Sequence, residues 1–227
     1  MSILYIIATP IGNLEDISIR AIRILKDVDF ILCEDTRVTK KLLDHYNIKT
    51  KIISYHHHSN LKKTEYIIDL LKQEKNLALV SDAGTPGISD PGNKLIEIII
   101  SQNINTKIEP IPGSSAVVTA LSVSGLPTDK FIFLGFPPHK KGRQKFIKSI
   151  ADYIFPVVIY ESKHRIIKFL EELVVFNKQK KFIKKVIVFR ELTKIHETIY
   201  RGELEEIINQ IKNDKNAQKG EFVVIIA

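Results

Sequence analysis

The feature that most constrains the fold is a regular alternation, in the first half of the chain, between short apolar runs and amphipathic stretches. The apolar runs have the length and β-branched composition of buried strands, and they lie at residues 3–8, 29–33, 51–54, 77–81 and 107–111. The amphipathic stretches place apolar side chains at helical spacing, at residues 17–27, 38–46, 61–73 and 93–102. Strands that alternate with helices in this way predict a parallel sheet in an α/β fold.

A second α/β unit follows a break at residues 125–127, which read Gly-Leu-Pro. A helical stretch at residues 115–124 precedes the break, and a strand at residues 131–134 follows it. The remaining strand-like runs lie at residues 156–160, 186–190, 197–201 and 221–227, and the helical patterns at residues 144–151, 166–176 and 204–212. We therefore expect two domains, residues 1–117 and 118–227.

The composition excludes several classes of protein. With 227 residues, of which 44% are hydrophobic and 26% charged, the chain can bury a core and is not disordered. The single cysteine, Cys33, leaves no partner for an intramolecular disulfide and too few thiols for a cysteine-based zinc site. No apolar run approaches the roughly 18 to 20 residues that span a bilayer. We expect a soluble, cytoplasmic protein.

The net charge of +8 lies in one half of the chain. Residues 1–115 carry 14 basic and 14 acidic side chains, whereas residues 116–227 carry 20 and 12. The excess is densest at residues 130–185, with 14 basic and 4 acidic side chains. A coding bias towards lysine would enrich both halves, so this distribution favours a surface that faces a polyanion over a merely solvated basic face.

Gly/Pro-rich loops follow three of the predicted strands of the first domain, at residues 9–13, 81–92 and 112–115. Ligands of open α/β folds bind at the carboxyl ends of the strands, so these loops are candidate binding loops. Their glycines allow close approach of the backbone to a ligand, and their prolines hold the loops in shape. The hydroxyls at residues 114–115 can cap a helix or reach a ligand. None of the loops matches a Walker P-loop or the GxGxxG pattern.

Other polar segments allow two interpretations. Residues 34–37, Glu-Asp-Thr-Arg, can form an acidic helix cap or offer a carboxylate and a guanidinium to a substrate. The three histidines at residues 56–58 lack the spacing of metal ligands, so we expect structural or substrate-contacting histidines and no metal. The charged turns at residues 160–165 and 190–201 form either solvated surface or the rim of an RNA-binding face.

Six motifs occur in chain order. They are Thr-Pro-Ile-Gly-Asn-Leu at residues 9–14, Cys-Glu-Asp-Thr-Arg at 33–37, Ser-Asp-Ala-Gly-Thr-Pro-Gly-Ile-Ser-Asp-Pro-Gly at 81–92, Pro-Gly-Ser-Ser-Ala at 112–116, Tyr-Glu-Ser at 160–162 and Arg-Glu-Leu-Thr-Lys at 190–194. Together they resemble the ribosomal RNA small subunit methyltransferase I family of the tetrapyrrole (corrin/porphyrin) methylase superfamily, over essentially the whole chain. The resemblance implies a parallel sheet in the first α/β domain, a mixed sheet in the second and a cofactor cleft between them. It also implies S-adenosylmethionine-dependent 2′-O-methylation of a cytidine in the decoding region of 16S rRNA, and a homodimer.

The resemblance assigns cofactor contacts position by position. In the first domain it implies contacts at Pro10, Asp82, Ala83, Gly84, Thr85, Gly113, Ser114 and Ser115. In the second domain it implies contacts at Tyr160, Arg190, Glu191, Gly220, Glu221 and Phe222. Two segments depart from the family pattern. Lys163 stands where the family commonly has proline, and residues 55–59 read Tyr-His-His-His-Ser in place of Tyr-His-Glu-His-Asn.

A ribose 2′-hydroxyl is a poor nucleophile until its proton leaves, so a base or a charge-stabilising group is expected near it. Asp35, with Arg37 beside it, is the first candidate, and Glu161 and His164 are alternatives. The basic stretch predicts RNA contacts at Lys140, Lys141, Arg143, Lys145, His164 and Arg165. The expected partner is 16S rRNA or the assembled small subunit.

Two rival functions are the alternatives, although the motifs favour the rRNA methyltransferase family over the first. A methylase of the same superfamily that acts on a carbon of a tetrapyrrole precursor could also use a basic domain, because such a macrocycle is anionic. A non-enzymatic RNA-binding module would explain the charge, but it would leave the shaped loops of the neutral half without a purpose. Retention of S-adenosylmethionine or its demethylated product by the purified protein separates the enzyme from the binding module.

Overall fold

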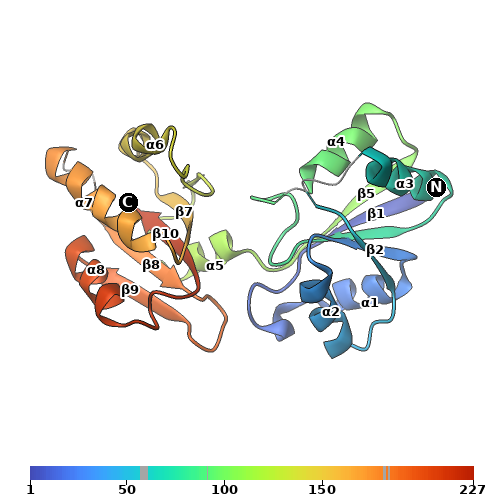
Figure 1. Cartoon of the computed structure of the whole chain (residues 1–227), viewed down its shortest axis with the longest axis horizontal. Coiled ribbons are helices and arrows are strands. Elements are labelled where there is room, and N and C mark those ends of the chain that lie inside the picture. Colours follow the sequence, from blue (N-terminus) through green and yellow to red (C-terminus); the bar gives the residue numbers. More distant parts are fainter. Residues whose placement is uncertain (57–60, 91, 181–182, 184) are drawn as a thin grey trace. The chain divides into compact units, whose positions relative to one another are not determined.

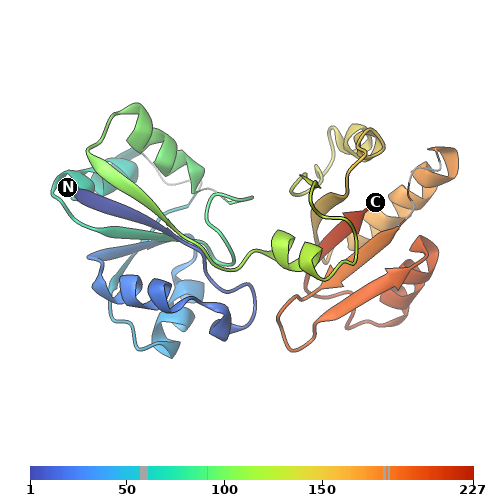
Figure 2. The same cartoon turned by 180° about the vertical axis from the view of Figure 1, so that it is seen from behind.

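The computed structural model describes residues 1–56, 61–90, 92–180, 183 and 185–227. The chain divides into two compact units, Met1–Ser115 and Ala116–Ala227, so the division lies two residues before the predicted one. Both units are α/β (Figures 1 and 2). The predictions about residues 57–59 and Pro91 fall outside the described residues.

The first unit contains the predicted parallel sheet. Its strands are β1 (Ser2–Ile7), β2 (Phe30–Cys33), β3 (Lys51–Ser54), β4 (Leu77–Val80) and β5 (Thr106–Ile111). They are ordered β3-β2-β4-β1-β5, and each neighbouring pair is parallel. The α-helices are α1 (Ile19–Asp27), α2 (Thr36–His45), α3 (Leu61–Lys72) and α4 (Asn93–Ser101). All five strand predictions are confirmed.

The first sheet is buried on both faces, as parallel sheets are. Along β2, Ile31 packs with α1 and α2 on one face, and Leu32 packs with α3 and α4 on the other. Figures 1 and 2 show the two helical layers. Helix α1 begins two residues later than predicted, because the Ser18 hydroxyl accepts the Ala21 N–H and caps the helix there. A short 3₁₀ helix, Leu14–Asp16, precedes it.

The second unit contains a mixed sheet, as the resemblance implied. Its strands are β6 (Ile132–Phe133), β7 (Val157–Ser162), β8 (Val186–Arg190), β9 (Thr198–Gly202) and β10 (Glu221–Ile226), in the order β6-β7-β10-β8-β9. The helices are α5 (Ala116–Ser122), α6 (Arg143–Ile150), α7 (Ile166–Lys180) and α8 (Leu204–Asn213). Strand β10 is antiparallel to both β7 and β8. The carboxyl ends of β7 and β8 and the start of β10 therefore share one edge of this sheet.

The described residues contain neither a candidate membrane span nor a candidate metal cluster. None of the helices there combines the length and the apolar character needed to cross a membrane. No group of three or more His, Cys, Asp or Glu side chains in the same ranges is arranged so that it could hold a metal ion.

Candidate active site

The three Gly/Pro-rich loops of the first unit meet at the carboxyl edge of its sheet, as predicted, because they follow the adjacent strands β4, β1 and β5. Thr9 and Gly84 exchange backbone hydrogen bonds of 2.9 and 3.0 Å, and the Thr9 hydroxyl donates to the Ser81 carbonyl at 3.0 Å. The Thr85 hydroxyl donates to the Ser114 carbonyl at 3.3 Å. These bonds join residues that are far apart in the sequence into one polar surface.

Two glycines allow these loops to approach each other closely. Gly84 has a φ of +82°, and a Cβ there would lie 3.4 Å from Ile11 Cγ2 and 3.7 Å from the Ser114 carbonyl oxygen. A Cβ on Gly113 would lie 3.0 Å from the Cβ of Ala8. A Cβ on Gly84 would make ordinary van der Waals contacts, although the positive φ disfavours any other residue there, whereas a Cβ on Gly113 would require Ala8 to move.

Hydrogen bonds hold the rest of the loop that joins β4 to α4. The Asp90 carboxylate accepts the backbone N–H groups of Gly87 and Gly92, at 3.1 and 2.8 Å. The Asn93 amide donates to the Gly87 carbonyl at 2.7 Å. The loop thus has a defined shape, which fits a preformed binding site better than a mobile surface turn.

Carboxylates gather at the same edge. Asp82 lies next to the start of helix α2, where its carboxylate accepts the Asp35 backbone N–H at 3.1 Å. Both Glu34 and Asp82 are exposed, but surrounding loops desolvate them in part. This desolvation raises the pKa of each, and neighbouring acidic groups, including Asp90, raise it further. The edge therefore favours a cationic ligand over an anionic one.

The predicted catalytic pair, Asp35 and Arg37, forms a local ion pair. Asp35 caps α2, with its carboxylate accepting the Arg37 N–H at 2.8 Å, and the Arg37 side chain binds both carboxylate oxygens. The hydrogen bonds from the Arg37 side chain, and then from its backbone, lower the pKa of Asp35 to about 2. A carboxylate with so low a pKa is a weak base, so this geometry favours the helix-cap interpretation over general-base catalysis.

The second-unit segments assigned to the cofactor come together at one edge of the second sheet. Phe222 is paired with Glu161 of β7 and with Arg190 of β8. Tyr160 is partly buried beside them. Burial raises the pKa of the Tyr160 phenol, which keeps it protonated at neutral pH.

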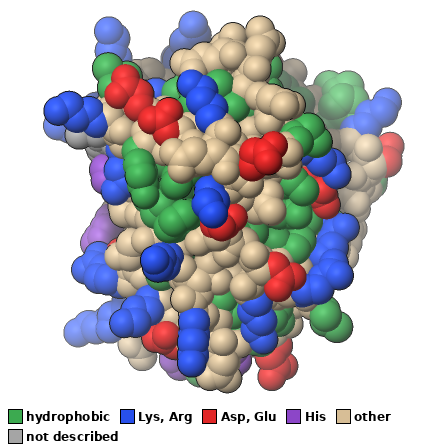
Figure 3. All heavy atoms as spheres, turned by 90° about the vertical axis from the view of Figure 1, so that its right-hand side faces the viewer, with side chains coloured by type: hydrophobic (Ala, Val, Ile, Leu, Met, Phe, Trp, Pro, Cys, Tyr) green, Lys and Arg blue, Asp and Glu red, His purple; other side chains and the backbone are tan. Residues whose placement is uncertain are grey.

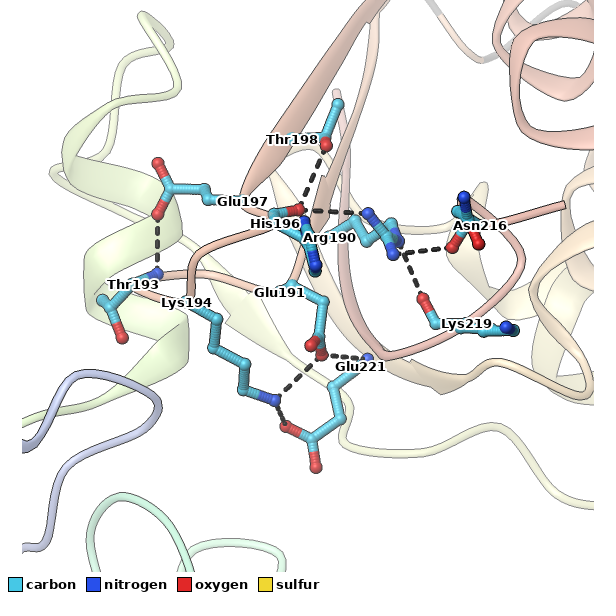
Figure 4. A network of polar contacts seen from close by, with 10 residues as sticks. All are labelled: Arg190, Glu191, Thr193, Lys194, His196, Glu197, Thr198, Asn216, Lys219 and Glu221. Carbon is cyan, nitrogen blue, oxygen red and sulfur yellow. Dashed lines mark hydrogen bonds and ion pairs between the residues drawn. The ribbon is translucent and has the colours of Figure 1, made fainter. Parts of the chain in front are cut away.

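Figure 4 shows the polar network at this edge. The Lys194 ammonium lies between the Glu191 and Glu221 carboxylates, 2.9 Å from an oxygen of each. Glu191 and Thr193 have positive φ values of 54° and 64°, which only a few non-glycine residues adopt. A Cβ on Gly220 would lie 2.5 Å from Glu191 side-chain atoms, so the neighbouring turn requires glycine. Such constrained turns often mark functional segments.

Two of the assigned residues direct their side chains inward. Arg190 is 7% exposed, and its guanidinium donates to the carbonyls of His196, Asn216 and Lys219 at 2.6 to 3.0 Å (Figure 4). Phe222 is 2% exposed and belongs to the core of the unit. These two residues are therefore in a position to offer backbone groups, and not side chains, to a ligand.

The predicted RNA contacts in the basic stretch, residues 130–185, include both exposed and buried side chains. Lys140, Lys141, Lys145 and His164 are exposed. Arg143 is 5% exposed, and its guanidinium lies 2.7 Å from Glu172 and 3.6 Å from Glu161. Arg165 lies 2.9 Å from Glu161. Because these two arginines are bound in the interior, we no longer expect their side chains to contact RNA, and Glu161, 1% exposed, is shielded from any substrate.

Sequence reasoning missed a basic hollow at the opposite edge of the first sheet, where the strands begin. It has a volume of about 680 Å³, and its lining includes Lys26, Lys49, Lys51 and Lys75 with one acidic residue, Asp29. Figure 3 shows this face, with lysine and arginine side chains prominent over its lower part. The equal charge balance of residues 1–115 concealed this clustering.

Comparison with known proteins identifies the class. The family model of the tetrapyrrole (corrin/porphyrin) methylases matches residues 3–208. Two solved structures share the fold: a cobalt precorrin-4 methyltransferase (TM-score 0.72, 17% identity, 98% of this chain and 93% of that one) and a diphthine synthase (TM-score 0.74, 13% identity, 100% and 90%). The fold and the site thus define a methylase of the tetrapyrrole methylase type.

Curated relatives narrow the assignment. Proteins named ribosomal RNA small subunit methyltransferase I are 46% identical in Hydrogenobaculum sp. (99% of this chain, 95% of the relative), 45% in Synechocystis sp. (100% and 79%) and 40% in Thermotoga maritima (100% and 99%). The chain therefore belongs to the ribosomal RNA small subunit methyltransferase I family. It is a methyltransferase that uses S-adenosylmethionine.

The first-unit edge fits this cofactor. S-adenosylmethionine carries a positive sulfonium and an ammonium group, which suit the carboxylates of Glu34 and Asp82, and polar groups that suit the exposed backbone of the loops. Gly84 and Gly113 keep side chains out of the space where the three loops meet. The individual first-unit contacts that the family resemblance implied stay a prediction.

Proposed function

We propose that the enzyme transfers a methyl group from S-adenosylmethionine to the ribose 2′-oxygen of a cytidine in the decoding region of 16S rRNA. The observation that carries the proposal is the near full-length similarity, at 40 to 46% identity, to proteins named ribosomal RNA small subunit methyltransferase I. The basic surface of the second unit supports an RNA substrate, because phosphate groups supply most of the affinity in nucleic-acid binding.

The residues divide this task between them. In our proposal, the first-unit loops at residues 9–13, 81–85 and 113–115 hold the cofactor. When bound, S-adenosylmethionine supplies an electrophilic methyl group. The protein must hold the acceptor oxygen in line with it, and positioning of this kind can lower a reaction barrier by about 7 to 11 kcal/mol. The braced loop and the bonds among the three loops give the site the rigidity that this requires.

Removal of the 2′ proton calls for a group with an adequate pKa. The hydrogen bonds from Arg37 lower the pKa of Asp35 to about 2, whereas the pKa values of Glu34 and Asp82 are raised. Glu34 and Asp82 are thus better proton acceptors than Asp35. We propose that Asp35 and Arg37 shape the start of α2 and leave the Arg37 guanidinium, which is 87% exposed, available to an RNA phosphate.

The RNA surface is tested by its salt dependence. Lys140→Glu combined with Lys141→Glu should lower the slope of log affinity against log salt by about 1 to 2, since each phosphate contact contributes roughly 0.7 to 0.9. Lys49→Glu combined with Lys51→Glu makes the same change of charge in the basic hollow and serves as the control. An equal loss of slope in both double variants would show that the effect is one of net charge and not of a defined surface.

The substrate class is tested by a transfer assay. Protein and S-adenosylmethionine with a labelled methyl group are incubated with small ribosomal subunits, with free 16S rRNA, and with an anionic tetrapyrrole precursor. Label should enter the RNA in one or both of the first two reactions and remain absent from the macrocycle. Label in the tetrapyrrole alone would replace the proposal with the rival activity.

We also propose that the enzyme is a homodimer that acts in the cytoplasm, where ribosomes are assembled. Dimers with two-fold symmetry are the commonest soluble homo-oligomers. Sedimentation equilibrium of the purified protein tests the first part. The chain mass is 25.9 kDa, so a particle of about twice that mass supports a dimer, and a particle of one chain mass at micromolar concentration contradicts it.

A further inference from the structure

A half-exposed aromatic ring stands on the loop that joins β6 to α6. Phe136 is 50% exposed, whereas the next residue, Pro137, is buried. The Phe136 ring contacts Tyr160 edge to face, with ring centroids 5.5 Å apart, and Tyr160 contacts Phe133 in the same way at 4.8 Å. The ring is thus supported on one side by an aromatic row and is open on the other.

The loop that carries this ring is held by buried charges. Arg165 donates to the Pro137 carbonyl at 3.3 Å, and Arg143 donates to the Pro138 carbonyl at 3.2 Å. Both guanidiniums are in turn paired with the fully buried Glu161. The backbone before the ring is fixed as well, because Tyr160 N–H donates to the Gly135 carbonyl at 2.9 Å.

The ion-pair cluster of Arg143, Arg165 and Glu161 has a desolvation cost that a contribution to stability alone does not explain. Buried ion pairs contribute little net stability compared with apolar packing of the same volume. Arg143 Nη2 and Glu161 Oε2 also lack a hydrogen-bond partner among the residues that the structure describes. What the cluster does achieve is to fix two successive carbonyls of one loop, and so the position of the exposed ring and of Lys140 and Lys141 that follow it.

We propose that Phe136 is a stacking platform for an unpaired base of the RNA substrate. The inference rests on the proposed function, and it adds the residue that reads the single-stranded character of the RNA. A nucleotide whose ribose is to be methylated must be accessible, and unpaired bases expose flat faces that stack on aromatic side chains. Lysines on the same loop supply the charge that a flanking phosphate requires, whereas a protein partner would gain nothing specific from them.

The proposal can be tested by fluorescence, because the chain contains no tryptophan. Phe136→Trp introduces the single fluorophore of that type and keeps a stacking surface. Titration with a single-stranded oligonucleotide of the decoding-region sequence should quench this fluorescence, and the same sequence in a duplex should not. A matched control is Tyr153→Trp, since Tyr153 is 38% exposed and precedes β7, at the opposite edge of the sheet from Tyr160.

Affinity gives a second, independent measurement. Phe136→Ala should weaken binding of the single-stranded oligonucleotide about tenfold or more, with an unchanged salt slope, since loss of stacking releases no counterions. Phe136→Trp should retain the affinity, and Tyr153→Ala should match the wild type. Cofactor affinity should be the same in all four proteins.

The outcomes separate this proposal from the proposed function. If the wild type binds and methylates RNA while Phe136→Trp is not quenched and Phe136→Ala binds normally, the stacking platform is refuted and the methyltransferase assignment stands. If the wild type neither binds nor methylates RNA, both are refuted. Equal quenching of the tryptophans introduced at positions 136 and 153 would refute a defined platform.

Discussion

Gly84 is the position at which one added methyl group should separate cofactor binding from folding. It has a φ of +82°, and a Cβ there would lie 3.4 Å from Ile11 Cγ2, at the point where the three loops meet. Gly125 provides the matched control. Its φ is +71°, and a Cβ there would meet nothing within 4 Å. Gly84→Ala and Gly125→Ala therefore impose the same kind of backbone strain, but only the first places a methyl group among the proposed binding loops.

The two substitutions should have similar costs in stability. A non-glycine residue in the left-handed region loses about 1 to 2 kcal/mol, which corresponds to a drop of several degrees in melting temperature for a unit of this size. Cofactor affinity should differ. Gly84→Ala should weaken S-adenosylmethionine binding at least about tenfold, or 1.4 kcal/mol, because the strained backbone and the added methyl group both lie among the proposed binding loops.

The assay is isothermal titration calorimetry of S-adenosylmethionine with the wild type and both variants, preceded by thermal denaturation of each protein. Equal melting temperatures for the two variants establish that their folds are comparably intact. If Gly84→Ala then binds the cofactor as tightly as Gly125→Ala does, the loops of the first unit do not form the site, and the placement fails.

Further predictions concern carboxylates. Asp35→Asn should leave the single-turnover methylation rate within about threefold of the wild type, because asparagine caps a helix as well as aspartate does, whereas loss of a general base lowers rates about 10²-fold or more. The same variant should be less sensitive to acid. The folded-state pKa of Asp35 is depressed to about 2 from its ordinary value of 3.8, so its stabilising effect is present above pH 4 and disappears as the pH falls towards 2. Urea denaturation of the wild type and the variant at pH 5 and pH 3 measures this difference. Glu161→Gln should destabilise the second unit by about 3 to 5 kcal/mol because it leaves the buried Arg143 and the partly buried Arg165 underpaired. Glu171→Gln, which removes an exposed pair with Lys212, should cost less than about 1 kcal/mol, and equal costs in urea denaturation would contradict the structural reading.

The sequence predicted the strands and helices well because their apolar periodicity is strong. Along β2, alternating side chains serve two cores, and the run at residues 29–33 marks the strand within one residue of its start. The meeting of the three loops was predictable for a related reason. Parallel strands have their carboxyl ends at one edge, so loops that follow adjacent strands must lie together.

The direction of charged side chains was not predicted, because charge counts do not distinguish faces. Side chains alternate between the two faces of a strand, and this alternation would have identified two of the inward-facing charged residues. Glu161 continues the inward face of Val157 and Ile159, and Arg190 continues that of Val186 and Val188. The same reasoning at helical spacing places Arg143 on the buried face of α6 with Ile147 and Ile150.

Other features had no signal in the sequence. The lysines of the basic hollow come from the end of α1, the start of β3 and the loops before β3 and β4, and only the tertiary fold brings them together. The low pKa of Asp35 depends on how the Arg37 side chain folds back upon it, which spacing alone leaves undetermined.

The most direct test of the central claim is to locate the transferred methyl group. Small subunits and free 16S rRNA lacking the modification are incubated with the enzyme and S-adenosylmethionine, digested with nuclease, and analysed by mass spectrometry. The account predicts 2′-O-methylcytidine at a single site in a fragment of the decoding region. A methyl group on a base, or methylation spread over many fragments, would contradict it.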